Sequence, residues 1–192
     1  MAVLYNGEIA RKAVHFSSLA VPIGLYLVPP DIARPVVLML ALAILTVDVV
    51  RLHLPPVRTV FYFLFGRILR EHERFNLLGS TYLILAALIC TYAFEQPIAV
   101  TALAFLVVGD TMAALVGRAI GRVRILDKTL EGSLACFFSC LAAGLLYPGP
   151  EPGLVPILVG SFTATLFELL PIPLDDNMRI PLAAGFAMTL VR

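Results

Sequence analysis

Charged side chains are scarce in this sequence. They make up 14% of the residues, whereas 60% are hydrophobic. Because soluble domains carry about 25% charged residues, this composition argues against a soluble domain and indicates an integral membrane protein. The net charge of +1 gives no reason to expect nucleic acid as a partner. At 192 residues, the chain is expected to be a single membrane domain extending over residues 1–192.

Cysteine is also rare, and two common types of phosphate-binding signature are missing. The three cysteines, Cys90, Cys136 and Cys140, lie in apolar segments without a matching Cys or His cluster, so no disulfide framework or cysteine metal site is implied. The sequence lacks the G-x-x-x-x-G-K-[ST] loop and the signature of soluble protein kinases. Any phosphate chemistry must therefore be assembled from other elements.

Long apolar segments are abundant. A membrane-spanning helix needs about 20 apolar residues. By that criterion about seven segments are predicted to span, near residues 13–29, 35–54, 77–95, 97–117, 131–147, 153–171 and 179–191. Residues 57–75 place apolar side chains at helical spacing opposite charged ones, which predicts an amphipathic helix at the membrane interface. The alternative is a further spanning helix, and the charges between Arg67 and Arg74 argue against it. The predicted fold is an all-α, polytopic membrane helix bundle.

The cations are distributed unevenly between the two sides of this bundle. Twelve of the 14 fall at the N-terminus or in the second, fourth and sixth connections, including both lysines, Lys12 and Lys128. By the positive-inside rule this predicts a cytoplasmic N-terminus. Six acids gather toward the same side: Asp48, Asp110, Glu131, Glu168, Asp175 and Asp176. An active site on the cytoplasmic face is therefore expected.

The segment 109–132 contains the most unusual charges. Asp110 lies in an apolar segment, where an ionisable residue is a candidate for a functional site. Ala113 and Gly117 follow it at helical spacing, and such small residues allow another helix or a phosphate to approach. We expect Asp110 to hold Mg²⁺ through a carboxylate oxygen. The alternative is a buried acid that pairs with an arginine for packing.

Lys128, Glu131 and Gly132 open the next apolar segment. Amides at a helix N-terminus favour anions. Lys128 and the amides near Gly132 are therefore predicted to hold phosphates, and Glu131 to support the metal. The alternative is a cationic membrane anchor followed by an ordinary acid in the first helical turn.

Asp175, Asp176 and Asn177 precede the last apolar segment. Two acids and an amide offer the hard oxygen ligands that divalent cations prefer. The same three residues are also typical of a helix-capping turn, so both interpretations stay open.

Arg11, Lys12 and His15 share one helix face, and taken alone they indicate only a membrane-surface anchor. The ordered set of motifs, however, resembles a known family. The set comprises Arg11-Lys12-x-x-His15, Glu73 with Gly79-Ser80-Thr81-Tyr82, Gly109-Asp110-x-x-Ala113-x-x-x-Gly117, Lys128-x-x-Glu131-Gly132, and Asp176-Asn177 with Pro181. From about residue 9 to 185 the chain resembles the polyprenol kinase superfamily, which contains dolichol kinase, phytol kinase and CTP-dependent diacylglycerol kinases. Phosphatidate cytidylyltransferases are more distant relatives of that group.

The resemblance implies phosphorylation of a lipid alcohol with a divalent metal, often with CTP rather than ATP as donor. It places Asp110, Lys128 and Glu131 at the nucleotide and metal, with Asp176 and Asn177 opposite. The expected catalytic residues are Asp110, Lys128 and Asp176. The expected phosphate-binding residues are Arg11, Lys12, Gly117, Arg118, Arg122, Lys128 and Gly132, and the expected metal ligands are Asp110, Glu131, Asp175, Asp176 and Asn177. Supporting roles are expected for His15, Asp48, Glu73, Thr81 and Glu168.

The leading hypothesis is a membrane lipid kinase that uses Mg²⁺ and CTP or ATP, with an isoprenoid alcohol or diacylglycerol as the acceptor. Asp110 or Asp176 would accept the hydroxyl proton. A cytidylyltransferase that forms a CDP-lipid would use the same acids and cations. An ion-coupled transporter is disfavoured, because the acids gather on one face and no inverted repeat is evident.

Overall fold

The computed structural model describes residues 12–66, 68–149 and 152–192, and it is helical almost throughout. After a helical stretch at residues 12–17, the helices are α2 (Ala20–Leu27), α3 (Pro30–His53), α4 (Pro55–Phe65), α5 (Gly79–Ala93), α6 (Gln96–Ile120), α7 (Leu130–Leu145), α8 (Leu154–Leu169) and α9 (Asp176–Leu190). A 3₁₀ turn, η1 (His72–Arg74), precedes α5. The predicted all-α fold is confirmed. The sequence did not predict the small antiparallel hairpin β1 (Arg124–Ile125) and β2 (Lys128–Thr129).

Each predicted apolar segment contains a helix, but the helices differ in length. Only α3 and α6, among the described residues, are long and apolar enough to cross a membrane by themselves. The apolar helices α5, α7 and α8 have 15 or 16 residues, and α9 has 15. The number of spans and the orientation of the N-terminus therefore stay predictions.

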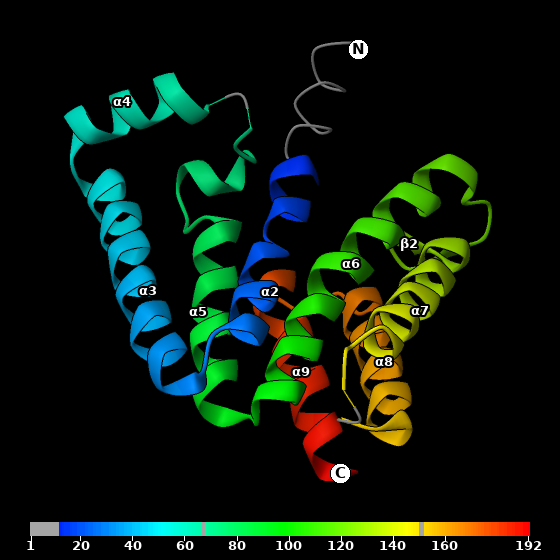
Figure 1. Ribbon diagram of the computed structural model, residues 1–192. Helices are drawn as coiled ribbons and strands as arrows, with labels where there is room; N and C mark the ends of the chain where they lie inside the picture. Colours follow the sequence, from blue (N-terminus) through cyan, green and yellow to red (C-terminus); the bar gives the residue numbers. More distant parts are fainter. Residues whose placement is uncertain (1–11, 67, 150–151) are drawn as a thin grey trace.

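Helix α6 lies at the centre of the bundle (Figure 1) and packs closely against α7. Small residues make this contact possible. A Cβ atom added to Gly109 would lie 2.6 Å from Sγ of Cys140, and one added to Gly132 would lie 2.8 Å from the carbonyl oxygen of Ala113 and 3.3 Å from Cα of Gly117. The predicted spacing of small residues thus serves helix packing, and it fixes Asp110 relative to the start of α7.

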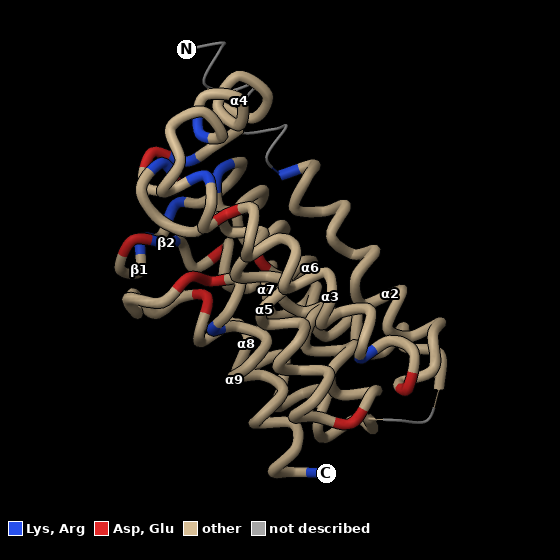
Figure 2. The backbone as a smooth tube through the Cα atoms, turned by 90° about the vertical axis from the view of Figure 1, so that its left-hand side faces the viewer, with Lys and Arg blue, Asp and Glu red and all other residues tan. Residues whose placement is uncertain are grey.

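Charged residues gather toward one end of the molecule, the end at which α4 and the hairpin lie (Figure 2). Helix α4 runs across that end of the bundle, as an interfacial helix would (Figure 1). It is shorter than predicted, however, because it ends at Phe65, and the described residues 68–75 form turns and the 3₁₀ helix η1. Gly66 caps the helix, and the Glu73 carboxylate holds the turn by accepting the Arg70 amide at 2.7 Å.

Candidate functional site

A buried ionic network fixes the segment before α5. Asp48 and Arg51, both from α3, are 1% and 0% exposed, and Nε of Arg51 lies 2.5 Å from Oδ1 of Asp48. The other Asp48 oxygen accepts the Leu78 amide at 2.8 Å and the Thr81 hydroxyl at 2.5 Å. The Arg51 guanidinium also donates to the carbonyl oxygen of Glu73 at 3.0 Å. The backbone that leads into α5 is therefore held by three residues that were expected to have supporting roles, Asp48, Glu73 and Thr81.

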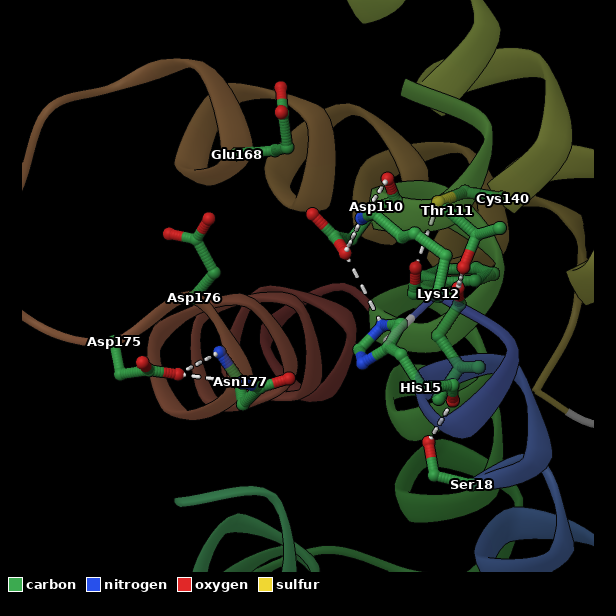
Figure 3. Close-up of polar contacts among 12 residues, drawn as sticks. Lys12, His15, Ser18, Asp110, Thr111, Cys140, Glu168, Asp175, Asp176 and Asn177 are labelled. Carbon is green, nitrogen blue, oxygen red and sulfur yellow. Dashed lines mark hydrogen bonds and ion pairs between the residues drawn. The ribbon is translucent and has the colours of Figure 1, made fainter. Parts of the chain in front are cut away.

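Asp110 lies on α6 and is paired with the helical stretch at residues 12–17. Nζ of Lys12 is 2.7 Å from Oδ2 of Asp110, and Nε2 of His15 is 3.4 Å from the same oxygen (Figure 3). The alternative interpretation of Asp110 was a buried acid paired with an arginine, but its partners in the structure are a lysine and a histidine. The structure also brings together residues that are 98 positions apart in sequence, which places Lys12 and His15 at the predicted centre.

Lys128 is presented by β2 and contacts two acids from other helices. Its Nζ atom lies 2.5 Å from Oε1 of Glu168 on α8 and 3.9 Å from Oδ2 of Asp176 at the start of α9. Burial disfavours its charge, but the hydrogen bond to Glu168 and the nearby acids outweigh burial and raise the pKa of Lys128 above its ordinary value. Lys128 is therefore a fixed positive charge at neutral pH.

Glu168 is more central than its predicted supporting role implied. It is 2% exposed, and its second oxygen, Oε2, has no hydrogen-bond partner within the described part of the chain. A buried polar atom without a partner is costly, so a ligand that reached this oxygen would satisfy it. Figure 3 shows Glu168, Asp176 and Asp110 in one region, contributed by three different helices.

Asp175 and Asn177 make the capping turn that was one of the two open interpretations. Oδ1 of Asp175 accepts the backbone amide of Asn177 at 2.9 Å and its side-chain amide at 2.8 Å. A guanidinium nitrogen of Arg70 lies 3.8 Å from the other Asp175 oxygen. The neighbouring Asp176 pairs with Arg179 and Lys128, so this acid of the turn is the one that contacts Lys128.

The predicted metal ligands do not form a ready-made cluster. Within residues 12–66, 68–149 and 152–192, no three His, Cys, Asp or Glu side chains are grouped so that they could hold a metal ion. The Glu131 carboxylate instead accepts the Val123 amide at 3.3 Å and so ties α7 to the hairpin. Mg²⁺ commonly uses one or two carboxylates together with water and substrate phosphates. The acids present therefore fit a site that the nucleotide would complete.

The predicted phosphate-binding residues have several different surroundings. Gly117 and Gly132 pack α6 against α7. Arg118 and Arg122 are located at the end of α6 and just beyond it, and Arg11 lies outside the described residues. Their assignment to phosphate stays a prediction, whereas Lys12 and Lys128 are placed beside the acids of the site.

Sequence reasoning missed a cavity of about 680 Å³ next to these residues. Its polar end is lined by Lys12, His15, Asp110 and Asn177, and most of its remaining wall is apolar. The sequence did not predict the role of Arg51 in the buried network either. The i, i+3 spacing of Asp48 and Arg51 on a helix was a signal that could have found it.

The chain has recognisable relatives. CTP-dependent diacylglycerol kinase 1 of Eremothecium gossypii is 31% identical over 96% of this chain and 67% of its own length. A probable chloroplastic phytol kinase 1 of Glycine max is 34% identical over 60% of this chain and 45% of its own length. An uncharacterized protein of Rickettsia prowazekii is 29% identical over 97% of this chain and 95% of its own length.

No protein-family model matches the chain, and no solved structure matches it significantly. The similarity to the first of the two kinases extends over nearly the whole chain, and two thirds of that kinase's length is covered. The chain belongs to the polyprenol kinase superfamily, the group of lipid kinases that includes the CTP-dependent diacylglycerol kinases and the phytol kinases.

Proposed function

We propose that this protein is a membrane lipid kinase that transfers the terminal phosphoryl group of a nucleoside triphosphate, preferably CTP, to the hydroxyl of a lipid alcohol. One observation carries the proposal. A cavity of about 680 Å³ with largely apolar walls ends at Lys12, Asp110 and Asn177. An amphiphile with an apolar tail and a hydroxyl head fits this arrangement. The CTP-dependent relative supports CTP as the donor.

The charges at the site suit phosphoryl transfer, which depends mainly on positioning and charge neutralisation. Lys12 and Lys128 are each held by a carboxylate, at 2.7 Å from Asp110 and 2.5 Å from Glu168. Phosphate oxygens offer the same charge-assisted hydrogen bonds as these carboxylates. We expect both lysines to turn to the phosphates when a nucleotide binds.

The acids would then be free for two tasks. Oε2 of Glu168 lacks a hydrogen-bond partner among the described residues, and Asp176 contacts the same lysine. Glu168 and Asp176 are the side chains that would hold Mg²⁺, which neutralises phosphate charge when bound. Of the two candidate proton acceptors, Asp110 lines the cavity and Asp176 does not. We therefore expect the substrate hydroxyl to give its proton to Asp110.

A label-transfer assay tests the proposal. Purified protein in detergent would receive Mg²⁺, γ-labelled CTP or ATP, and phytol, geranylgeraniol or diacylglycerol. Label in the lipid phase identifies a kinase and names its donor and acceptor. Asp110→Asn hardly changes volume but removes the charge, so we expect a folded protein without turnover. CDP-lipid formed from phosphatidate and α-labelled CTP, without transfer to any alcohol, would replace the kinase with a cytidylyltransferase.

A further inference from the structure

We propose that a hydrocarbon chain of the substrate lies in the cavity between residues 12–21, α3 and α5, that it enters sideways from the bilayer, and that the packed cluster beyond Ala43 limits its length. The proposal rests on the lipid-kinase function and adds where the tail lies. One observation carries it: Asp110 and the apolar side chains line one and the same cavity. A tail bound there brings its own hydroxyl to the acid that would accept the proton.

The walls of the cavity are contributed by several elements and are mainly hydrocarbon. Val14 and Val21 line one side, and Ile44 and Val47 of α3 line the other. Phe61 and Phe65 of α4 line it as well, near the charged end of the molecule. Burial of apolar surface is the main source of affinity in such a site. These apolar walls therefore suit a hydrocarbon chain. The other charged side chains that line the cavity, Asp48, Glu73 and Arg70, already have partners within the protein.

The cavity is closed at the end away from Asp110. Val21, Ile44 and Ile84 line it and also belong to the packed apolar cluster in which Leu25 and Val37 are buried. α2 and α3 converge there, and Figure 1 shows the two helices joined at that end and spread apart toward the charged end. A chain that extends from Asp110 must stop at this packed cluster.

Ala43 carries the smallest of the apolar side chains that line the cavity. It lies on α3 about one helical turn farther from the charged end than Val47. Because Ala43 is exposed, a larger side chain there would fill the cavity without crowding the packed core. Ala43 is thus the position at which the usable length of the cavity can be changed.

The side of the cavity is open between residues 12–21 and α3. Val14 and Val47 line opposite walls, and they are 53% and 52% exposed. In a bilayer, both would face lipid. A membrane-dissolved alcohol can therefore slide its tail between the two helices without leaving the hydrophobic phase.

The cavity has room for a hydrocarbon chain. Its volume of about 680 Å³ far exceeds the roughly 10–15 Å³ of such volume that one water molecule needs. An isoprenoid alcohol of the length of geranylgeraniol therefore fits in it.

Substitution of Ala43 tests the proposal through chain-length selectivity. We expect Ala43→Phe to lower the ratio of kcat/KM for geranylgeraniol to that for geraniol by about tenfold or more, since one misplaced methylene in an apolar pocket already costs about tenfold. Leu42→Phe is the matched control. Leu42 is also exposed on α3, at 52%, but does not line the cavity. An unchanged ratio in an active Ala43→Phe enzyme overturns the proposal, whereas a wild-type enzyme that phosphorylates no alcohol overturns the proposed function.

Photo-cross-linking gives a second readout that needs no turnover. A geranylgeraniol analogue with a diazirine at the far end of its tail should label the peptides that contain Val21, Ile44 or Ile84 in wild-type protein, and excess geranylgeraniol should suppress the labelling. In Ala43→Phe this labelling should fall severalfold, and in Leu42→Phe it should not. Labelling confined to the outer surfaces of α7 and α8 would contradict a tail in this cavity.

Discussion

Replacement of Lys128 by methionine should destabilise the protein because it leaves the Glu168 carboxylate buried without a partner. Glu168 is 2% exposed, whereas the Lys128 side chain is 35% exposed. Breaking a buried ion pair from one side costs roughly 3–5 kcal/mol. Solvent screens the lysine partly, so we take about 2–3 kcal/mol for this pair. At about 2–4 °C per kcal/mol for a chain of this size, the melting temperature should fall by about 5–10 °C.

A double variant separates this structural effect from the chemical one. In Lys128→Met/Glu168→Gln no charge of the pair remains, so most of the lost stability should return, as a double-mutant cycle measures. Phosphoryl transfer should stay absent in both variants, because the cation that would bind the phosphates is gone. Thermal unfolding at one detergent concentration and scan rate gives the stabilities, and the label-transfer assay gives the activities.

Arg124→Met is the control for both assays, since Arg124 is an exposed cation of the same hairpin. It should melt within about 1 °C of wild type, as surface substitutions usually do. Transfer restored in the double variant would refute a role of Lys128 at the phosphates. If Lys128→Met alone melts like wild type, the pair of Lys128 and Glu168 contributes no stability.

Three further expectations concern packing, metal and pH. Gly132→Ala should cost about 1–3 kcal/mol in thermal unfolding, because its Cβ would lie 2.8 Å from the carbonyl oxygen of Ala113. Gly24→Ala should raise the stability by up to about 1 kcal/mol, because a Cβ atom there would have nothing within 4 Å. If Gly132→Ala were the more stable of the two variants, the tight α6–α7 contact would be refuted. Excess EDTA should abolish phosphoryl transfer and Mg²⁺ should restore it, so full activity in EDTA would exclude the metal. Folding raises the pKa of Lys128. The ion pair with Glu168 therefore contributes its full stabilisation below the ordinary lysine pKa, and this stabilisation is lost only as pH rises through the raised pKa of the folded protein. The stability difference between wild type and the double variant should thus be constant from about pH 6 to 9, and a decline within that range would contradict the raised pKa.

The apolar segments were predictable because a long hydrophobic run is rare outside a membrane span or a buried helix. Helices α3 and α6 lie where the sequence placed them. Asp110 was singled out because a charge in apolar sequence is costly and so marks a candidate site, whereas Lys12 and Lys128 were singled out by the order of the motifs. The contact between Lys12 and Asp110, 98 positions apart, was not predicted, because no local pattern links two positions so distant in sequence.

The hairpin, the cavity and the environment of Glu168 depend on geometry that local sequence patterns do not contain. The hairpin strands have two residues each, too few to show a period, and the turn between them places Leu126 at φ 54°. Leucine is an uncommon residue at positive φ, so the turn has no sequence signature. The cavity is lined by residues from α3, α4, α5 and the stretch 12–21, as well as Asp110 and Asn177, so it depends on the packing of many side chains together. The unpaired oxygen of Glu168 is visible only once its neighbours are in place.

The network around Arg51 has an evolutionary consequence for α4. Arg51 fixes the chain before α4, and its bonds to the carbonyl oxygens of Glu73 and Asn76, at 3.0 and 2.9 Å, fix the chain after it. Helix α4 itself has no fully buried residue, and a change in the length of a connecting segment costs little free energy. Mutation can therefore rebuild α4, and with it one wall of the cavity, while Asp110 and Lys128 keep their positions. Within this architecture, acceptor preference and phosphoryl-transfer chemistry can diversify independently.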